Sequence, residues 1–192
     1  IAARFVVGLS GNLGFTHDPD IVFQAARLLR EERDIHFLLS GWGMGFARLK
    51  DMQAAAQLAN VTLVDRVADS ELDALLSSAD AWLIPYRKDV AGVSVPSRFY
   101  NLLAAGRPVI LVSEPEAEAA LTVSENGLGW VVTPGRPDQL ADAVRLASRS
   151  QDTGMAERAV ATARSFSPER ALASYAALVA ELLSDRDVER TA

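Results

Sequence analysis

Short apolar runs alternate along the chain with longer amphipathic stretches, which is the pattern of strands that alternate with helices. The apolar runs predict six strands, at residues 4–9, 35–39, 61–64, 81–84, 109–112 and 128–132. Helices are predicted between them, at 46–59, 114–125 and 138–148 and from residues 19, 70 and 96 onward. Strands joined in this way form a parallel sheet, so we expect an α/β fold: a three-layer α/β/α Rossmann-like domain with a six-stranded parallel sheet.

Several helices carry recognisable start signals. Asp18, Asp69 and Ser167 are predicted as N-caps, because their side-chain oxygens can accept a hydrogen bond from the first helical turn. Proline lacks a backbone N–H and suits the first helical position, as at residues 19, 96 and 168. Residues 152–192 are predicted to form a helical C-terminal tail of the same domain, with a break near residues 166–168. Its last helix carries one apolar stripe, formed by Leu172, Tyr175, Val179 and Leu182.

The stretch from residue 81 to residue 112 organises the expected site. It predicts a buried strand, an irregular segment, a short helix from Pro96 and a second buried strand. The N-terminus of that helix presents free N–H groups at the carboxyl edge of the sheet, where anions bind well. Ser97 and Arg98 lie in its first turn and can add a hydroxyl and a guanidinium. A helix dipole disfavours a cation there, and a bound anion would explain Arg98.

Two glycine-rich segments follow the first two predicted strands. Ser10–Gly14 is predicted as a loop, and it suits either a phosphate held by backbone N–H groups or a tight strand-to-helix turn. Gly41–Gly45, with Asp65 at the end of the next strand, imitates a dinucleotide-binding fingerprint. Phe46 stands where that fingerprint needs glycine or alanine, so an NAD-binding domain is the least favoured interpretation.

Composition narrows the classes of partner. The 192 residues carry a net charge of −6, which argues against a nucleic-acid-binding surface. They suit one globular domain, and no apolar run is long enough for a transmembrane segment. The chain begins with Ile1, close to a predicted strand, and we expect it to be a piece cut at a domain boundary.

The residues that usually hold metal ions are scarce. Cysteine is absent, which fits a reducing, cytoplasmic location and excludes thiolate ligands. The two histidines lie far apart in the sequence: His17 is expected at the surface near the first glycine segment, and His36 is expected as a packed or edge residue of a strand. No metal site and no cofactor are therefore predicted.

Five motifs in order carry a family resemblance. They are Val7–Gly14, Phe37–Gly43, Ala79–Pro85, Val95–Arg98 and Ala104–Ile110. This succession resembles the C-terminal, nucleotide-sugar-binding domain of GT-B-fold, retaining glycosyltransferases of the group 1, family 4-like type, most closely those that build bacterial cell-surface polysaccharides. The resemblance implies a hexosyltransferase whose N-terminal, acceptor-binding domain is absent from this chain. It further implies that the chain alone is inactive and that the whole enzyme is cytoplasmic, with the inner face of the membrane reached through the absent domain.

The motifs also suggest which residues meet the donor. The predicted donor-binding residues are Gly11, Asn12, Gly14, Ser94, Val95, Ser97, Arg98 and Asn101. The resemblance implies that Arg66 and Val67, which follow the third strand, meet the base through backbone groups. The expected partner is therefore a nucleoside diphosphate-sugar, bound as substrate without a metal ion, and no residue is assigned as catalytic.

Two positions depart from the family pattern. Relatives commonly carry two glutamates eight positions apart, and those positions fall on Val93 and Asn101. The Asn101 amide oxygen can keep part of a ribose contact, whereas Val93 cannot replace a carboxylate that grips the sugar. Two alternatives to an active transferase therefore stay open: a sugar-nucleotide epimerase of related fold, which would need carboxylates near the sugar, and the donor-binding domain of an inactive transferase.

Overall fold

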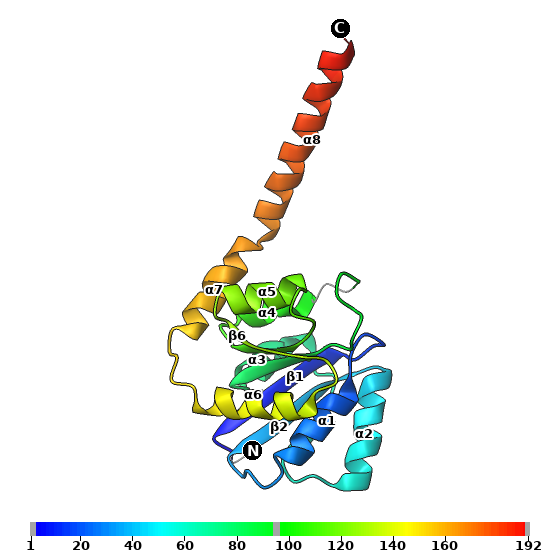
Figure 1. The fold of residues 1–192 in the computed structure, drawn as a ribbon, viewed down its shortest axis with the longest axis vertical. Helices are drawn as coiled ribbons and strands as arrows, with labels where there is room; N and C mark the ends of the chain where they lie inside the picture. Colours follow the sequence, from blue (N-terminus) through cyan, green and yellow to red (C-terminus); the bar gives the residue numbers. More distant parts are fainter. Residues whose placement is uncertain (1–2, 94–96, 191–192) are drawn as a thin grey trace.

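The computed structural model describes residues 3–93 and 97–190, and a six-stranded sheet forms its centre (Figure 1). Every strand pairing is parallel, and the strand order is β3-β2-β1-β4-β5-β6. The strands are β1 (Phe5–Asn12), β2 (Ile35–Trp42), β3 (Val61–Asp65), β4 (Ala81–Pro85), β5 (Val109–Val112) and β6 (Gly129–Val132). The predicted α/β fold with a six-stranded parallel sheet is confirmed.

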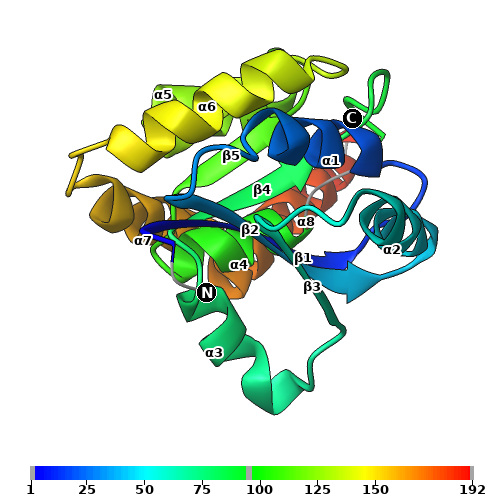
Figure 2. The same ribbon diagram turned by 90° about the horizontal axis from the view of Figure 1, so that it is seen from below.

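Helices cover both faces of the sheet and complete the three predicted layers (Figure 2). One face carries α1 (Pro19–Leu28), α2 (Met44–Ala56) and α6 (Pro137–Arg149). The other face carries α3 (Leu72–Ser77), α4 (Ser97–Ala104), α5 (Glu118–Glu125) and α7 (Met155–Ser165). Alternate strand residues point to opposite faces, so Val7 belongs to the apolar core on the face with α1, and Val6 belongs to the core on the face with α4. Burial on both faces explains why these strands read as continuous apolar runs.

The first two strands are longer than predicted. β1 ends at Asn12 instead of residue 9, and β2 ends at Trp42 instead of residue 39. The additional residues continue the parallel pairing, with Gly11 opposite Gly41. A Cβ atom at Gly41 would lie 2.2 Å from the carbonyl oxygen of Gly11, so the strands meet too closely for a side chain there. The first part of the predicted Ser10–Gly14 loop is therefore strand, because both β1 and β2 carry glycine at the point of closest approach.

Two helix starts follow the predicted capping chemistry. Asp18 Oδ1 accepts hydrogen bonds from the N–H groups of Asp20 at 3.0 Å and Ile21 at 3.3 Å, and Pro19 is the first residue of α1. Ser167 Oγ accepts the N–H of Arg170 at 3.4 Å, at the start of α8 (Pro168–Arg190). The predicted start of α4 at Pro96 lies outside the described residues.

Other helix boundaries differ from the prediction. Asp69 does not cap α3; it opens a short 3₁₀ helix (Asp69–Glu71), and the Glu71 carboxylate accepts the N–H of Ala68 at 3.2 Å. Residues 114–117 form a turn before α5, closed by the N–H of Ala117 and the carbonyl of Glu114 at 3.1 Å, because proline at residue 115 suits the second position of such a turn. α2 begins two residues earlier than predicted and ends at Ala56, where Gln57 adopts a left-handed conformation with φ 50°.

The C-terminal tail is helical, as predicted, and its two helices differ in their surroundings. α7 packs on α4, whereas α8 projects away from the domain (Figure 1). The predicted stripe of α8, represented by Leu172 and Tyr175, is exposed in this structure. No helix within the described residues is long and apolar enough to cross a membrane.

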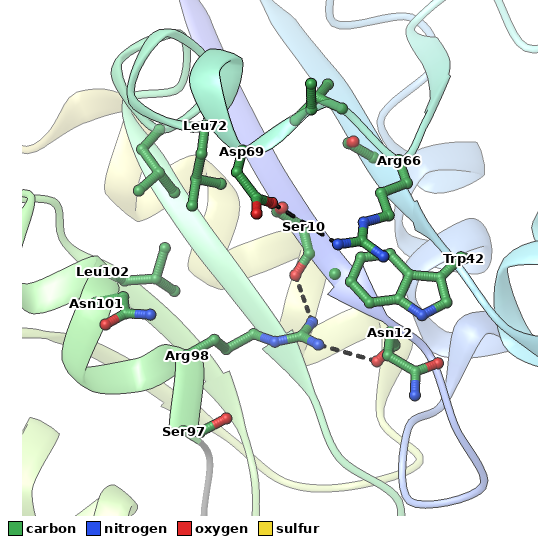
Figure 3. Close-up of a pocket in the computed structure, with 15 residues that line it drawn as sticks. Ser10, Asn12, Trp42, Arg66, Asp69, Leu72, Ser97, Arg98, Asn101 and Leu102 are labelled. Atoms are coloured by element: carbon green, nitrogen blue, oxygen red, sulfur yellow. Dashed lines mark hydrogen bonds and ion pairs between the residues drawn. The ribbon is translucent and has the colours of Figure 1, made fainter.

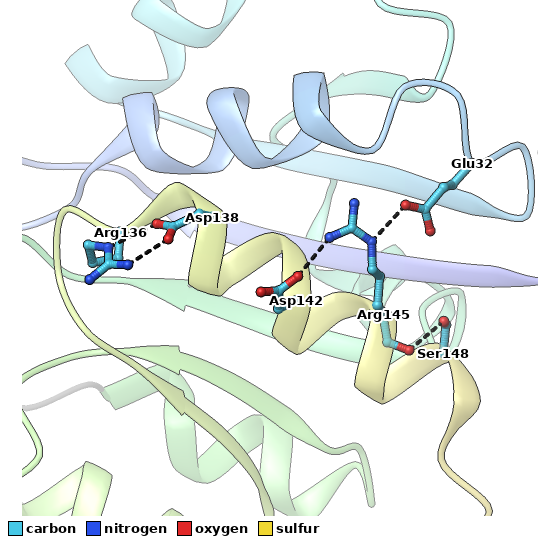
Figure 4. A network of polar contacts seen from close by, with 6 residues as sticks. All are labelled: Glu32, Arg136, Asp138, Asp142, Arg145 and Ser148. Atoms are coloured by element: carbon cyan, nitrogen blue, oxygen red, sulfur yellow. Dashed lines mark hydrogen bonds and ion pairs between the residues drawn. The ribbon is translucent and has the colours of Figure 1, made fainter.

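An ion-pair network ties α6 to the first βαβ unit (Figure 4). Arg145 Nε lies 2.7 Å from Glu32 Oε1, in the loop between α1 and β2, and its Nη1 lies 2.7 Å from Asp142 Oδ1 within α6. Arg145 and Glu32 are both half-buried, so solvent screens this contact less than it screens a fully exposed pair. The network holds two distant parts of the sequence together on the face of the sheet that carries α1.

Candidate functional site

A cavity of about 360 Å³ opens at the carboxyl edge of the sheet, where the strand order reverses between β1 and β4 (Figure 3). Open α/β sheets bind ligands in this crevice, and the volume is within the usual range for a small-molecule site. Its walls come from the ends of β1 and β2, the segment after β3, α3 and the first turns of α4. The lining residues are Ser10, Gly11, Asn12, Ser40, Trp42, Arg66, Val67, Ala68, Asp69, Leu72, Leu76, Ser97, Arg98, Asn101 and Leu102.

Most of the predicted donor-binding residues meet around this cavity. The predicted residues on its wall are Gly11, Asn12, Arg66, Val67, Ser97, Arg98 and Asn101. Gly14 is not among the lining residues, because the chain has already turned away from the sheet edge after Asn12. Ser94 and Val95 lie outside the described residues, so their part in the site stays a prediction.

Arg98 crosses from α4 to the end of β1. Its Nη1 donates to the carbonyl oxygen of Ser10, and its Nη2 donates to the carbonyl oxygen of Asn12 at 3.0 Å. Burial lowers the pKa of this guanidinium, which still remains charged at any physiological pH. The described contacts use Nη1 and Nη2 once each, so other N–H groups of the fork are left for a ligand. Among the described contacts, Arg98 forms no ion pair with a nearby acid such as Asp89.

Gly11 makes room for Arg98. It has φ +114°, and a Cβ atom there would lie 2.5 Å from Arg98 Nη2. The sequence left two roles open for the segment around this glycine, a phosphate site and a tight turn, and the structure adds a contact with Arg98. The missing side chain allows the guanidinium to lie across the end of β1, so Gly11 and Arg98 form one unit of the cavity wall.

The opposite wall combines the predicted residue Arg66 with residues that were not predicted as part of the site. Trp42 lies at the end of β2, and the Arg66 guanidinium carbon is 4.8 Å from the centroid of its ring (Figure 3). Asp69 Oδ1 lies 3.7 Å from Arg66 Nη2. The neighbouring apolar wall is formed by Leu72, Leu76 and Leu102. A tryptophan close to the end of a predicted buried strand is the signal that would have pointed to this wall, since carboxyl ends of parallel strands converge at one edge.

The second glycine run serves packing. A Cβ atom at Gly43 would lie 2.4 Å from Asn12 Oδ1, and one at Gly45 would lie 2.9 Å from the Leu13 carbonyl oxygen. These glycines therefore let the start of α2 lie directly against the segment that follows β1. The run also lies at the end of β2, whereas a dinucleotide fingerprint follows the first strand, at the reversal point. Both observations disfavour an NAD site here.

Each of the two histidines contacts a residue from another part of the chain: Tyr86 for His17 and Thr62 for His36. His17 is only 9% exposed, so the predicted surface location is wrong; an antiparallel bridge to Tyr86 carries it inward, and the two ring centroids lie 5.1 Å apart. Burial, and then the charge of Arg98, lower the pKa of His17 to about 4. His36 lies half-buried in β2, as predicted, and its Nε2 is 2.8 Å from Thr62 Oγ1. Within the described residues, no three histidine, aspartate or glutamate side chains are close enough to hold a metal ion.

Two bacterial proteins of known name are similar in sequence. "Probable glycosyltransferase WbjE" of Pseudomonas aeruginosa is 28% identical over 131 residues, which are 68% of this chain and 32% of that protein. "Putative colanic acid biosynthesis glycosyl transferase WcaI" of Escherichia coli is 30% identical over 143 residues, 74% of this chain and 35% of that protein. The chain therefore spans about a third of the length of these relatives.

Two solved structures with the same fold are glycosyltransferases. A glycosyltransferase from Rickettsia africae superposes with a TM-score of 0.74 at 17% identity, over 95% of this chain and 49% of that one. The catalytic domain of cholesterol-alpha-glucosyltransferase from Helicobacter pylori superposes with a TM-score of 0.70 at 14% identity, over 86% of this chain and all of that one. Residues 3–166, nearly the whole three-layer domain, match the model of the family described as glycosyl transferases group 1. The chain belongs to this family, and its fold is that of a GT-B glycosyltransferase domain.

Proposed function

We propose that this chain is the donor-binding domain of a glycosyltransferase and that it holds a nucleoside diphosphate-sugar in the cavity between β1 and α4. The observation that carries the proposal is the position of Arg98, whose guanidinium lies in the cavity wall at the point where the strand order reverses. Within a chain of net charge −6, this is a local cationic site, as an anionic ligand requires. Ser97 and the first turn of α4 lie beside it.

In this proposal the diphosphate lies against Arg98 and Ser97, the ribose near Asn101, and the base near Arg66 and Val67. Arginine forms charge-assisted, often bidentate bonds with phosphate oxygens, which suits it to the diphosphate position. Ser94 and Val95 precede α4 in the sequence and are proposed to complete the diphosphate site. The amide of Asn101 offers both a donor and an acceptor for ribose hydroxyls.

Named relatives support this assignment and extend it. One solved structure of similar fold is a variant of S. aureus TarM in complex with Fondaparinux, alpha-GlcNAc-glycerol and UDP, with a TM-score of 0.72 at 16% identity over 91% of this chain and 35% of that one. The Escherichia coli relative is named for colanic acid biosynthesis. We therefore propose that the whole enzyme works in the cytoplasm on a glycan or a lipid-linked acceptor, which the part of the enzyme absent from this chain would bind.

The proposed chemistry is electrostatic. Negative charge grows on the diphosphate as the bond to the sugar breaks, and in this proposal Arg98 and the N–H groups of the first turn of α4 stabilise that charge. Fixed donors of this kind can stabilise the leaving group without a divalent metal, so we propose a metal-independent reaction. Among the described residues that line the cavity, Asp69 is the only carboxylate, and it faces Arg66. This observation disfavours the epimerase alternative, which needs carboxylates near the sugar.

An inactive transferase remains the second candidate. Val93 is 72% exposed and is not among the residues that line the cavity, and Asn101 stands at the other family glutamate position. Neither side chain can supply the carboxylate that the family pattern implies. This candidate predicts nucleotide binding by the whole protein without transfer of a sugar.

Transfer assays test the proposal and separate these candidates. We expect no sugar transfer by this chain alone, and transfer with little donor hydrolysis by the whole protein. Turnover by this chain alone, with purity established, would show that the acceptor site lies within it.

Addition of EDTA should leave the activity of the whole protein largely intact, because no metal ligands are proposed. Loss of activity that magnesium restores would contradict the metal-independent mechanism.

A further inference from the structure

Trp42 presents an exposed aromatic plane inside a concave site. It is the last residue of β2, it is 43% exposed, and it lines the cavity on the side away from Asn101 (Figure 3). The other two tryptophans, Trp82 and Trp130, are buried and half-buried within the domain. An indole ring is costly to leave in contact with water, so a flat apolar ligand would gain free energy by covering it.

The backbone of Trp42 is held by strand pairing. Trp42 lies opposite Asn12 in the parallel pairing of β1 and β2, and its carbonyl oxygen accepts the N–H of Leu13 at 2.9 Å. Gly43 follows with φ +93°, which brings the chain against Asn12. The indole is therefore carried by a fixed strand end, and a ligand that packs on it would have little backbone to order on binding.

The Arg66 guanidinium lies over one face of the indole. Its carbon is 4.8 Å from the centroid of the Trp42 ring, within the range of a cation–π contact, and its Nη2 lies 3.7 Å from Asp69 Oδ1. A guanidinium is planar and itself stacks on aromatic rings. Trp42 and Arg66 therefore form a stacked pair of one indole and one guanidinium, at the end of the cavity opposite to Asn101 (Figure 3).

We propose that Trp42 is the stacking surface for the base of the nucleotide, and that Arg66 steadies the indole on this wall. The inference rests on the proposed function, since it assigns a position to one part of the proposed ligand. Stacking on an aromatic ring depends little on which base is present, because every base has a π face. Trp42 should therefore contribute to affinity for purine and pyrimidine nucleotides alike, and other residues would select among them.

Titration calorimetry with nucleoside diphosphates and with inorganic pyrophosphate tests this assignment. Trp42→Ala should weaken binding of whichever of UDP, GDP, ADP, CDP or dTDP binds best by about 5- to 150-fold, the range for loss of one base–aromatic stack. Trp42→Phe should keep most of the affinity, and Trp42→Leu should lose it as Trp42→Ala does. Pyrophosphate has no base, so wild type and all three Trp42 variants should bind it with the same affinity.

Controls make the outcomes distinct. Phe15 is 75% exposed and does not line the cavity, so Phe15→Ala should change neither affinity. Thermal melts should show that the Trp42 variants fold, since an exposed side chain leaves no core cavity when it is truncated. Wild-type affinity for the nucleotide in Trp42→Leu, or an equal loss for pyrophosphate in Trp42→Ala, would overturn the stacking role alone. Failure of the wild type to bind any nucleoside diphosphate would overturn the proposed function itself.

Discussion

Arg98→Ala is expected to weaken binding of a nucleoside diphosphate by about one to two orders of magnitude. A hydrogen bond to a charged group contributes roughly 1.5–3 kcal/mol, and each ~1.4 kcal/mol is a tenfold change in affinity. The guanidinium lies in the cavity wall with N–H groups beyond those that bind Ser10 and Asn12. Calorimetric titration of wild type and variant with UDP or GDP, whichever binds, measures the effect.

A matched variant separates the diphosphate contact from the ribose contact. Asn101→Ala should weaken binding of the nucleoside as much as binding of the nucleoside diphosphate, because the proposed contact is with ribose. The loss in Arg98→Ala should vanish when the ligand carries no phosphate. Equal affinities of wild type and Arg98→Ala for the nucleoside diphosphate, with both proteins folded, would remove Arg98 from the binding site.

The structure changes the expected effect of Arg98→Ala on the free energy of unfolding. The sequence alone predicts an unaffected fold, because an arginine in the first turn of a helix is usually exposed. In the structure Arg98 is half-buried, and it holds the carbonyl oxygens of Ser10 and Asn12 at the end of β1. Loss of these two hydrogen bonds should lower the free energy of unfolding by about 1–3 kcal/mol, so affinities should be compared below the melting temperature of the variant.

The second large effect concerns acid stability and depends on His17. The pKa of His17 is lowered from 6.5 to about 4 by burial and by Arg98, so the folded protein keeps this side chain neutral. Between pH 6.5 and pH 4 the unfolded chain binds a proton that the folded chain does not, and the free energy of unfolding therefore falls as pH falls. The full contribution is present above pH 6.5 and amounts to about 3 kcal/mol at most.

Urea unfolding at a series of pH values measures this contribution. His17→Asn removes the titrating group, so the variant should lose less stability than wild type between pH 6.5 and pH 4, whatever its stability at neutral pH. Burial also lowers the pKa of His36, and that residue is unchanged in both proteins, so its contribution cancels in the comparison. Parallel pH profiles of wild type and His17→Asn would show that His17 stays accessible to protons in the folded protein.

The order of elements could be predicted because local sequence determined it. Apolar runs marked strands that are buried on both faces, and Asp18 with Pro19 marked a helix start through chemistry that acts within one turn. The extensions of β1 and β2 could not be predicted in this way. Their pairing depends on the close approach of Gly11 and Gly41, which are 30 residues apart and resemble loop residues when each is read alone.

The candidate site was predictable to the extent that it follows from topology. Carboxyl ends of parallel strands share one edge, so residues after β1 and β3 and at the start of α4 were expected to converge there. The roles of individual side chains were less predictable. Trp42 turned out to face the cavity and His17 to be buried under Tyr86, because neighbours from other strands decide both positions. The sequence around each residue carries no record of those neighbours.

An NMR titration of this chain with nucleoside diphosphates tests most directly whether the cavity between β1 and α4 binds the donor nucleotide. We expect saturable shifts, with one nucleoside diphosphate, in the amides of Ser10–Asn12, Val67, Arg98 and Asn101 and in the indole N–H of Trp42. Amides at the opposite edge of the sheet, such as those of Phe5 and Ile35, should stay unchanged. Saturable shifts elsewhere, or none with any of the nucleotides, would contradict the account.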